Sequence, residues 1–242
     1  MSAISLAAAA FVSTALGGAF ALRFSKSFRS ILGLTAGVLL GVVGFEVLPE
    51  LFTLTHATGV DPMRGMLALV GGFLLFHASE KLLLIHHAQE SSYVSHHHPT
   101  VGTLSALALT GHSFMDGVGI GLGFQVSPRT GAMVALAVIA HDFADGLNTV
   151  TLMLTHGNDR KRALIALALD AVAPMAGAAS TLLFHLPPTA LVLYLGFFAG
   201  FLLYIGAADI LPEAHSEKSS PSTIALTCAG AGFAYLVSRL AG

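Results

Sequence analysis

Two short motifs near the middle of the chain place imidazole and carboxylate groups at helical spacing. Residues 111–117 read GHSFMDG and residues 141–146 read HDFADG. In each motif a histidine precedes an aspartate by four residues, so a helix carries both side chains on one face. Two such helices facing each other would gather two imidazoles and two carboxylates, a ligand set that suits zinc, iron(II), manganese, cobalt or nickel. The predicted metal ligands are His112, Ser113, Asp116, His141, Asp142 and Asp145.

Further ionisable residues could extend this site or line a route to it. Asp170 lies midway along an apolar segment, one turn before Pro174, and we interpret it as a metal ligand rather than as a lone protonated acid. The candidates for a transport pathway lie towards the ends of two apolar segments, where they could line the route or only extend their charged groups to the membrane surface. They are Glu46, Glu50, Asp209 and Glu213. A predicted His-rich cytoplasmic loop over residues 85–100 could capture metal loosely or serve only as a hydrophilic linker. Its histidines are His86, His87, His96, His97 and His98.

The composition places the chain in a membrane. Of its 242 residues, 55% are hydrophobic and only 10% are charged, and the mean hydropathy is +0.79. In a soluble domain roughly a quarter of the residues are charged, so a disordered chain and a soluble enzyme are both excluded. The net charge of -2 provides no basic surface for nucleic acid. The single cysteine, Cys228, excludes an internal disulfide.

Charged and Pro/Gly-rich breaks divide the chain into eight apolar segments, each long enough to cross a bilayer as a helix. We therefore predict an all-α polytopic membrane protein, an eight-helix transmembrane bundle that forms a single domain over residues 1–242. The predicted spans are 4–22, 30–51, 64–84, 101–124, 130–154, 161–184, 189–211 and 221–240. Most Lys and Arg residues fall in alternate loops, so the positive-inside rule predicts that these loops are cytoplasmic and that both termini lie outside.

A short repeat relates two of these spans. Residues 45–50 read FEVLPE and residues 208–213 read ADILPE, an offset of 163 residues that aligns the second span with the seventh. Successive spans cross in opposite directions, so a repeat between an even-numbered and an odd-numbered span is inverted, as in transporters with a midplane site. We predict that spans one to three and six to eight form an inverted repeat around spans four and five. Two helices that merely end at proline would give the same residues.

Together these features resemble the ZIP (Zrt- and Irt-like) family of divalent metal transporters over the whole length of the chain. The family's fourth span typically carries H-[NS]-x-x-E-G and its fifth a related form, which HSFMDG and HDFADG resemble with aspartate in place of glutamate. The stretch YIGAADILPEA from Tyr204 is similar to the family's seventh span. The resemblance implies a binuclear site. One ion would be bound by His112, Asp116, His141 and Asp145, and the second would lie near Ser113, Asp116, Asp142, Asp145 and Asp170.

The leading hypothesis is a transporter, not an enzyme, that moves a divalent metal ion across the plasma membrane toward the cytoplasm by alternating access. Zinc is the favoured substrate, with iron, manganese, cobalt, nickel and cadmium as alternatives. The partners are the metal ion and the lipid bilayer, with no nucleic acid, and a homodimer is compatible with the sequence. Two other classes stay open, a membrane di-metal enzyme and a proton-coupled carrier of a small molecule.

Overall fold

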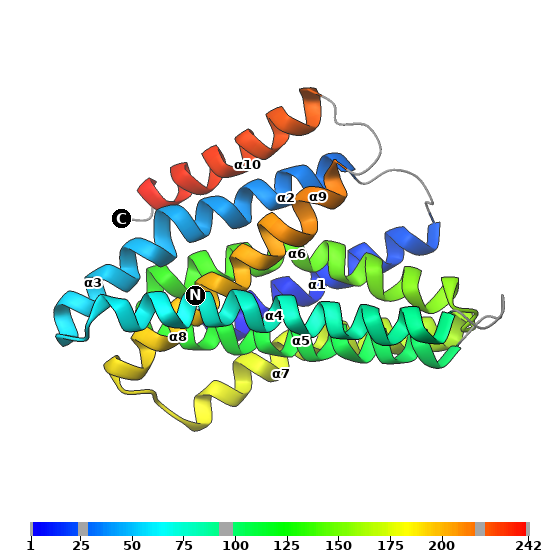
Figure 1. Cartoon of the computed structure of the whole chain (residues 1–242), viewed down its shortest axis with the longest axis horizontal. Coiled ribbons are helices and arrows are strands. Elements are labelled where there is room, and N and C mark those ends of the chain that lie inside the picture. The colour runs from blue at the N-terminus through cyan, green and yellow to red at the C-terminus, as the bar shows by residue number, and fades with distance from the viewer. Residues whose placement is uncertain (1, 24–28, 92–98, 216–220, 241–242) are drawn as a thin grey trace.

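Every regular element in the part of the chain that the structure describes is a helix (Figure 1). The computed structural model describes residues 2–23, 29–91, 99–215 and 221–240. The α-helices are α1 (Ala3–Arg23), α2 (Arg29–Val42), α3 (Leu48–Thr58), α4 (Pro62–Ser91), α5 (Pro99–Val126), α6 (Pro128–Thr155), α7 (Arg160–Ser180), α8 (Pro188–Leu203), α9 (Leu211–Ala214) and α10 (Pro221–Leu240). Two π-helical segments, η1 (Val43–Val47) and η3 (Tyr204–Ile210), join α2 to α3 and α8 to α9, and a 3-10 turn, η2 (Thr181–Leu183), follows α7. The predicted all-α class is confirmed for these residues.

Local sequence signals set the ends of the helices around the centre of the chain. Ser127 separates α5 from α6, and its side chain accepts a hydrogen bond from the backbone N–H of Thr130. Asp159 caps α7 in the same way by accepting from the N–H of Arg162. Such caps satisfy N–H groups that the first helical turn leaves without a partner. Gly59 ends α3 with φ of 68°, a left-handed conformation that favours glycine.

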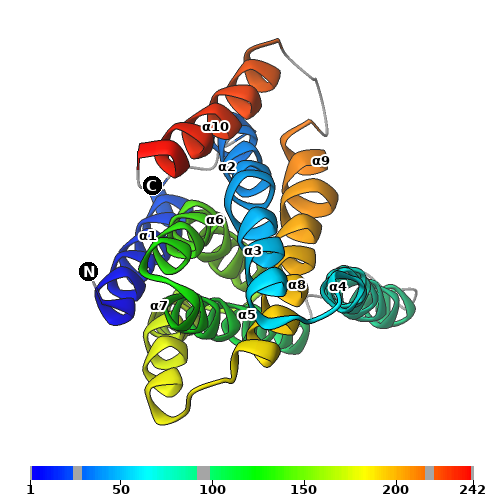
Figure 2. The ribbon, with the colours of Figure 1, turned by 90° about the vertical axis from the view of Figure 1, so that its left-hand side faces the viewer.

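The helices pack into two bundles. The first bundle comprises α1, α5, α6 and α7, and the second comprises α2–α3, α4, α8–α9 and α10. Figure 2, which looks along the helices, shows the first bundle on one side and α2, α10, α8 and α4 around the other. Two hydrogen bonds connect the bundles. The Thr35 hydroxyl of α2 donates to Ala140 O of α6 at 3.1 Å. The Tyr194 hydroxyl of α8 donates to Gly119 O of α5 at 2.5 Å.

Glycines bring helix backbones into contact in the first bundle. A Cβ built on Gly17 of α1 would overlap the Phe143 carbonyl of α6. A Cβ built on Gly177 of α7 would overlap the Phe114 carbonyl of α5. Small residues of this kind let membrane helices approach closely. The pair α1 and α6 therefore meets in the same manner as the pair α7 and α5.

The second bundle contains a matching pair of glycine contacts. A Cβ on Gly37 of α2 would overlap the Thr227 carbonyl of α10, and a Cβ on Gly200 of α8 would overlap the Leu69 carbonyl of α4. The offset of 163 residues that aligns the two LPE sequences also aligns Gly37 with Gly200. The pairs α2 with α10 and α8 with α4 thus share one packing mode.

Each LPE sequence directly follows one of the two π-helical segments. The Leu48 N–H donates to Val43 O and the Leu211 N–H donates to Gly206 O, each to a carbonyl five residues back. In both places the next residue is proline, which has no N–H and whose ring clashes with the carbonyl four residues earlier. The proline therefore widens the preceding turn instead of ending the helix. The sequence predicts that the second span ends at residue 51, but the helix continues through α3 to Thr58.

Six helical segments of the described chain are long and apolar enough to cross a membrane. They are Ala3–Arg23, Leu32–Thr58, Pro128–Thr155, Arg160–Leu183, Pro188–Ala208 and Pro221–Leu240. The predicted third and fourth spans correspond to α4 and α5, helices of 30 and 28 residues.

Candidate metal site

The two motifs lie at the midpoints of α5 and α6. His112 is thirteen residues from the start of the 28-residue α5, and His141 is thirteen residues from the start of the 28-residue α6. At about 1.5 Å per residue, each histidine lies about 20 Å from either end of its helix. A site between these helices is therefore midway across the bundle.

The structure brings the two histidine–aspartate pairs together. One ligand atom from each of His112, Asp116, His141 and Asp145 lies within 4.8 Å of the other three. His112 Nε2 is 3.3 Å from Asp116 Oδ2 and 3.7 Å from Asp145 Oδ2. His141 Nε2 is 3.5 Å from Asp116 Oδ2 and 3.7 Å from Asp145 Oδ2. In a tetrahedral zinc site with ligand bonds of about 2.0–2.1 Å, ligand atoms lie about 3.3 Å apart, so this spacing fits such an ion with small movements.

The His141 ring is oriented so that its Nε2 faces the carboxylates of Asp116 and Asp145. Its Nδ1 is 2.9 Å from Ala137 O, and because a carbonyl only accepts hydrogen bonds, Nδ1 carries a proton. In the neutral ring Nε2 then has no proton and is available as a metal ligand. A backbone partner on the other ring nitrogen is the usual arrangement of a metal-binding histidine.

Buried polar atoms of this cluster lack hydrogen-bond partners among the residues that the structure describes. These atoms are Asp116 Oδ1, Asp116 Oδ2, His141 Nε2 and Asp142 Oδ1. Asp116, His141 and Asp142 have no exposed surface. An isolated buried carboxylate costs several kcal/mol, and adjacent carboxylates also repel each other. A divalent cation among these atoms would remove both penalties.

A second group of polar residues lies beside the first. The carboxylate of Asp170 accepts hydrogen bonds from the Ser113 hydroxyl at 2.7 Å and from the Thr149 hydroxyl at 2.8 Å. Asp142 Oδ2 accepts from the Thr14 hydroxyl at 3.2 Å, and Asp142 Oδ1 is 3.9 Å from His141 Nε2. Asp170 of α7 is therefore joined to α5 and α6 by hydrogen bonds, as its predicted place near the motifs requires.

The two threonines of this second group were not predicted from the sequence. Thr149 lies four residues after Asp145, so the helical spacing that selected the aspartates extends to it. Thr14 lies in an Ala-rich helix that carries no local motif, so nothing in its own segment marks it.

The first cluster faces the boundary between the bundles. The His112 ring meets Phe201 of α8 with ring centroids 5.0 Å apart and Phe76 of α4 at 6.1 Å, both edge to face. The side chains of His112 and Asp145 keep 17% and 11% of their surface exposed, whereas those of Asp116 and His141 keep none. Within the first cluster, His112 and Asp145 are therefore the residues that keep exposed side-chain surface.

The remaining predicted site residues lie elsewhere. Glu46 is buried in η1 and pairs with Arg129, and Glu50 is half-buried one turn later in α3. Asp209 lies in η3 and Glu213 in α9, and their side chains are outside the described part. The predicted loop begins later than expected because α4 continues to Ser91 and includes two of its histidines. Those two are His86 and His87, whereas His96, His97 and His98 lie outside the described residues.

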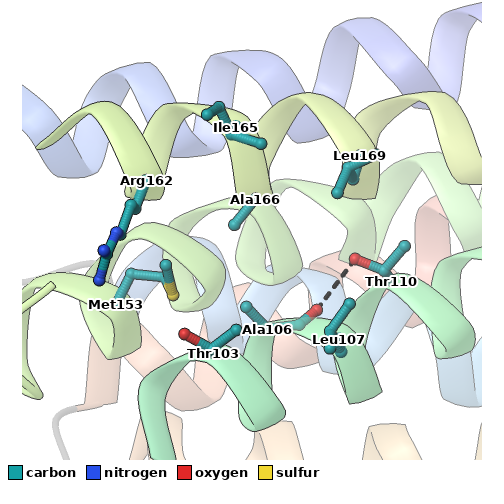
Figure 3. A pocket seen from close by; sticks show the side chains of 9 residues that line it. All are labelled: Thr103, Ala106, Leu107, Thr110, Met153, Arg162, Ile165, Ala166 and Leu169. Atoms are coloured by element: carbon teal, nitrogen blue, oxygen red, sulfur yellow. Dashed lines mark hydrogen bonds between the residues drawn. The ribbon is translucent and has the colours of Figure 1, made fainter. Parts of the chain in front are cut away.

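A separate cavity of about 370 Å³ lies among α5, α6 and α7 (Figure 3). In Figure 3, Arg162, Ile165, Ala166 and Leu169 of α7 face the α5 side chains across it. Its lining is mainly apolar and contains neither histidine nor carboxylate. The cavity lining therefore offers no His/carboxylate ligand set like that of the His/Asp cluster.

Comparison with protein families agrees with this geometry. A family model described as ZIP Zinc transporter matches residues 85–238, which include α5 to α8 and both motifs. The chain belongs to the ZIP zinc transporter family. Comparison with curated proteins gives no match. ZIP family members are membrane transporters and not enzymes, so the predicted class is confirmed and the family indicates a divalent metal as substrate.

Proposed function

We propose that this ZIP protein transports divalent metal ions through the His/Asp cluster between α5 and α6, and that zinc is its favoured substrate. The observation that carries the proposal is the convergence of two imidazoles and two carboxylates midway along the bundle. The same cluster would accept iron(II), manganese, cobalt, nickel or cadmium because none of its ligands is selective for one of them.

The proposed site holds two ions. Ligands for the first are His112, Asp116, His141 and Asp145. Asp142 and Asp170 would bind the second ion, together with Ser113. Asp116 and Asp145 would contribute the carboxylate lone pairs that face away from the first ion. Support comes from the hydrogen bonds that place Asp170 beside Ser113 and from the unpartnered Asp142 Oδ1. Binding would require the Ser113 hydroxyl to turn from Asp170 toward the ion.

The proposed cycle moves the first bundle against the second. Four residues of the first bundle supply the cluster, while Phe76 and Phe201 of the second cover His112. Rotation or sliding at this boundary would expose the cluster to one membrane face and then to the other, as alternating access requires.

An inverted repeat within eight spans would give the two end states related structures. Both bundles consist of matched helix pairs: α1 with α6 corresponds to α7 with α5, and α2 with α10 corresponds to α8 with α4. The glycine contacts and the two π segments occur at corresponding positions of these pairs. In this arrangement α4 and α5 also span the membrane, and residues 1–242 form one transporter domain.

The proposed orientation places both termini outside and the His-rich segment over 85–100 in the cytoplasm of a plasma-membrane protein. Support comes from the asymmetry of Lys and Arg between alternate connections. Metal would then move toward the cytoplasm, where the loop histidines would receive it.

Zinc uptake into proteoliposomes tests the proposed function. The native protein is expected to raise zinc flux above that of empty vesicles, and Asp145→Ala is expected to abolish the increase. Asp61→Ala, which removes an exposed carboxylate at the start of α4, is the matched control and should keep native flux. Absence of flux with zinc, iron, manganese, cobalt, nickel and cadmium, or native flux in Asp145→Ala, would overturn the proposal.

A further inference from the structure

An ion pair between a buried carboxylate and a partly exposed arginine connects three helices at one end of the molecule. Arg129, near the start of α6, places its Nε 2.9 Å from Glu46 Oε1 and 3.0 Å from Glu46 Oε2. Its terminal nitrogen donates to Ser238 O at 2.7 Å and to Ser238 Oγ at 3.0 Å. The Ser238 hydroxyl in turn donates to Glu46 Oε2 at 2.7 Å. Glu46 is 3% exposed, so this carboxylate depends on the arginine and serine for its compensation.

The π segment creates the position of this carboxylate. Pro49 cannot donate to the Phe45 carbonyl, and the Ser238 hydroxyl lies 3.2 Å from that oxygen as well. The widened turn of η1 thus presents both Phe45 O and the Glu46 carboxylate to α10. We name Arg129, Glu46 and Ser238 the triad.

The triad crosses the boundary between the bundles. Arg129 belongs to the first bundle, whereas Glu46 and Ser238 belong to the second. Twelve residues separate Arg129 from His141, so the triad lies about 18 Å along α6 from the metal cluster. A movement that separated the bundles at this end would have to break the ion pair and its hydrogen bonds.

The other half of the repeat lacks the arginine. The offset that relates the two LPE sequences carries Glu46 onto Asp209, so an acid is present at both positions. The shift that carries His112 onto His141 carries Thr100 onto Arg129. An arginine–carboxylate pair like that of the triad therefore cannot form between the corresponding residues Thr100 and Asp209.

We propose that the triad is a latch that closes the boundary between the bundles at the end bearing Arg129 and must open once in every transport cycle. Arg129 and Ser238 are positioning residues that act through Glu46 and do not touch the metal. Breaking the latch should shift the population toward the state that is open at this end. This inference rests on the alternating movement of the two bundles in the proposed function.

Thiol accessibility reports the latch without any metal flux. Met133 lies one helical turn beyond Arg129 on the same face of α6 and is 1% exposed. In a Cys228→Ser background, Met133→Cys supplies a single thiol, which a charged methanethiosulfonate reagent can reach in nanodiscs only when the boundary opens. Arg129→Ala is expected to raise the labelling rate about tenfold, given the strength of hydrogen bonds to charged groups. Arg129→Lys keeps the positive charge but loses the planar guanidinium group, which donates to Glu46 and Ser238 at once. This variant should give an intermediate labelling rate.

Arg64→Ala is the matched control, because it removes an exposed arginine from the start of α4. Its labelling rate should equal that of the parent. If Arg129→Ala does not fold, Glu46→Gln and Ser238→Ala test the same latch and should also raise the rate. Unchanged labelling in the triad variants, or an equal increase in Arg64→Ala, would overturn the latch. Absent zinc flux in the native protein would instead overturn the proposed function, so the two failures are distinguishable.

Discussion

At the scale of single residues, Asp116 is the centre of the metal cluster. Its Oδ2 is 3.3 Å from His112 Nε2 and 3.5 Å from His141 Nε2, and its side chain is fully buried. A carboxylate in this position is costly without a cation and strongly favourable with one. In the proposed function, the Asp116 carboxylate therefore strengthens metal binding but lowers the stability of the metal-free protein.

Asp116→Asn should separate those demands. The amide removes the buried negative charge, so the metal-free protein should unfold at a higher temperature than the native protein. Zinc at one hundred times its Kd should stabilise the native protein by about 2.7 kcal/mol and the variant by much less. Thermal unfolding with and without zinc measures both effects. Asp61→Asn should retain the native response, and an undiminished zinc effect in Asp116→Asn would contradict this role.

Asp170→Asn tests the second ion. Asp170 contacts Ser113 and Thr149 but is not among the four residues of the first cluster. The variant should lower the metal content from about two ions to about one per chain, because neutral amide oxygens bind divalent cations less well than carboxylates. Elemental analysis after dialysis gives the stoichiometry. Two retained ions would show that Asp170 is not a ligand, and loss of both would show that the two sites are not separable.

At the scale of helices, glycine contacts fix the position of the motifs. Gly117 directly follows Asp116, and a Cβ at this position would overlap the Pro174 carbonyl of α7. Gly146 directly follows Asp145, and a Cβ there would overlap the Thr14 carbonyl of α1. The glycine of each motif therefore sets the distance between the helix that carries the motif and its neighbour.

Gly117→Ala should consequently destabilise the protein and weaken zinc binding, since α5 must move away from α7 and carries Asp116 with it. We expect a cost of about 1–3 kcal/mol from overpacking. Gly111→Ala is the control on the same helix, where an added Cβ meets no atom within 4 Å, and it should be neutral or stabilising by up to about 1 kcal/mol. Denaturation and zinc titration of both variants provide the comparison. Equal effects of the two substitutions would contradict the packing argument.

The convergence of the four residues in the first cluster could be predicted from the sequence, whereas several contacts between the helices could not. The i, i+4 spacing of histidine and aspartate is a local property, so the sequence alone selects the four residues of the first cluster. The partner of Glu46 could not be predicted, because Arg129 lies far from it in the chain and the contact depends on how α6 meets η1. The LPE repeat is visible in the sequence, but its effect on the backbone depends on whether proline ends a helix or widens it. Here the turn before Pro49 widens and the helix continues as α3.

At the scale of the whole molecule, the structure combines a two-bundle architecture with a site on the boundary between them. The site residues belong to the first bundle, the aromatic cover belongs to the second, and the triad links the bundles about 18 Å from the site. Charge is scarce in this chain. Most of the acids within helices whose side chains the structure describes belong either to the His/Asp site or to the triad. A carrier that moves one bundle against the other would use both of them in each cycle.

The most direct test of this account is zinc K-edge X-ray absorption on the purified protein loaded with one equivalent of zinc. We predict a coordination shell of nitrogen and oxygen at about 2.0–2.1 Å, with the multiple-scattering signal of two imidazoles. His112→Ala with His141→Ala should remove that signal, whereas His96→Ala with His97→Ala should leave it intact. An unchanged spectrum in the first pair of substitutions, or loss of the signal in the second, would contradict the claim that His112, Asp116, His141 and Asp145 bind the transported ion.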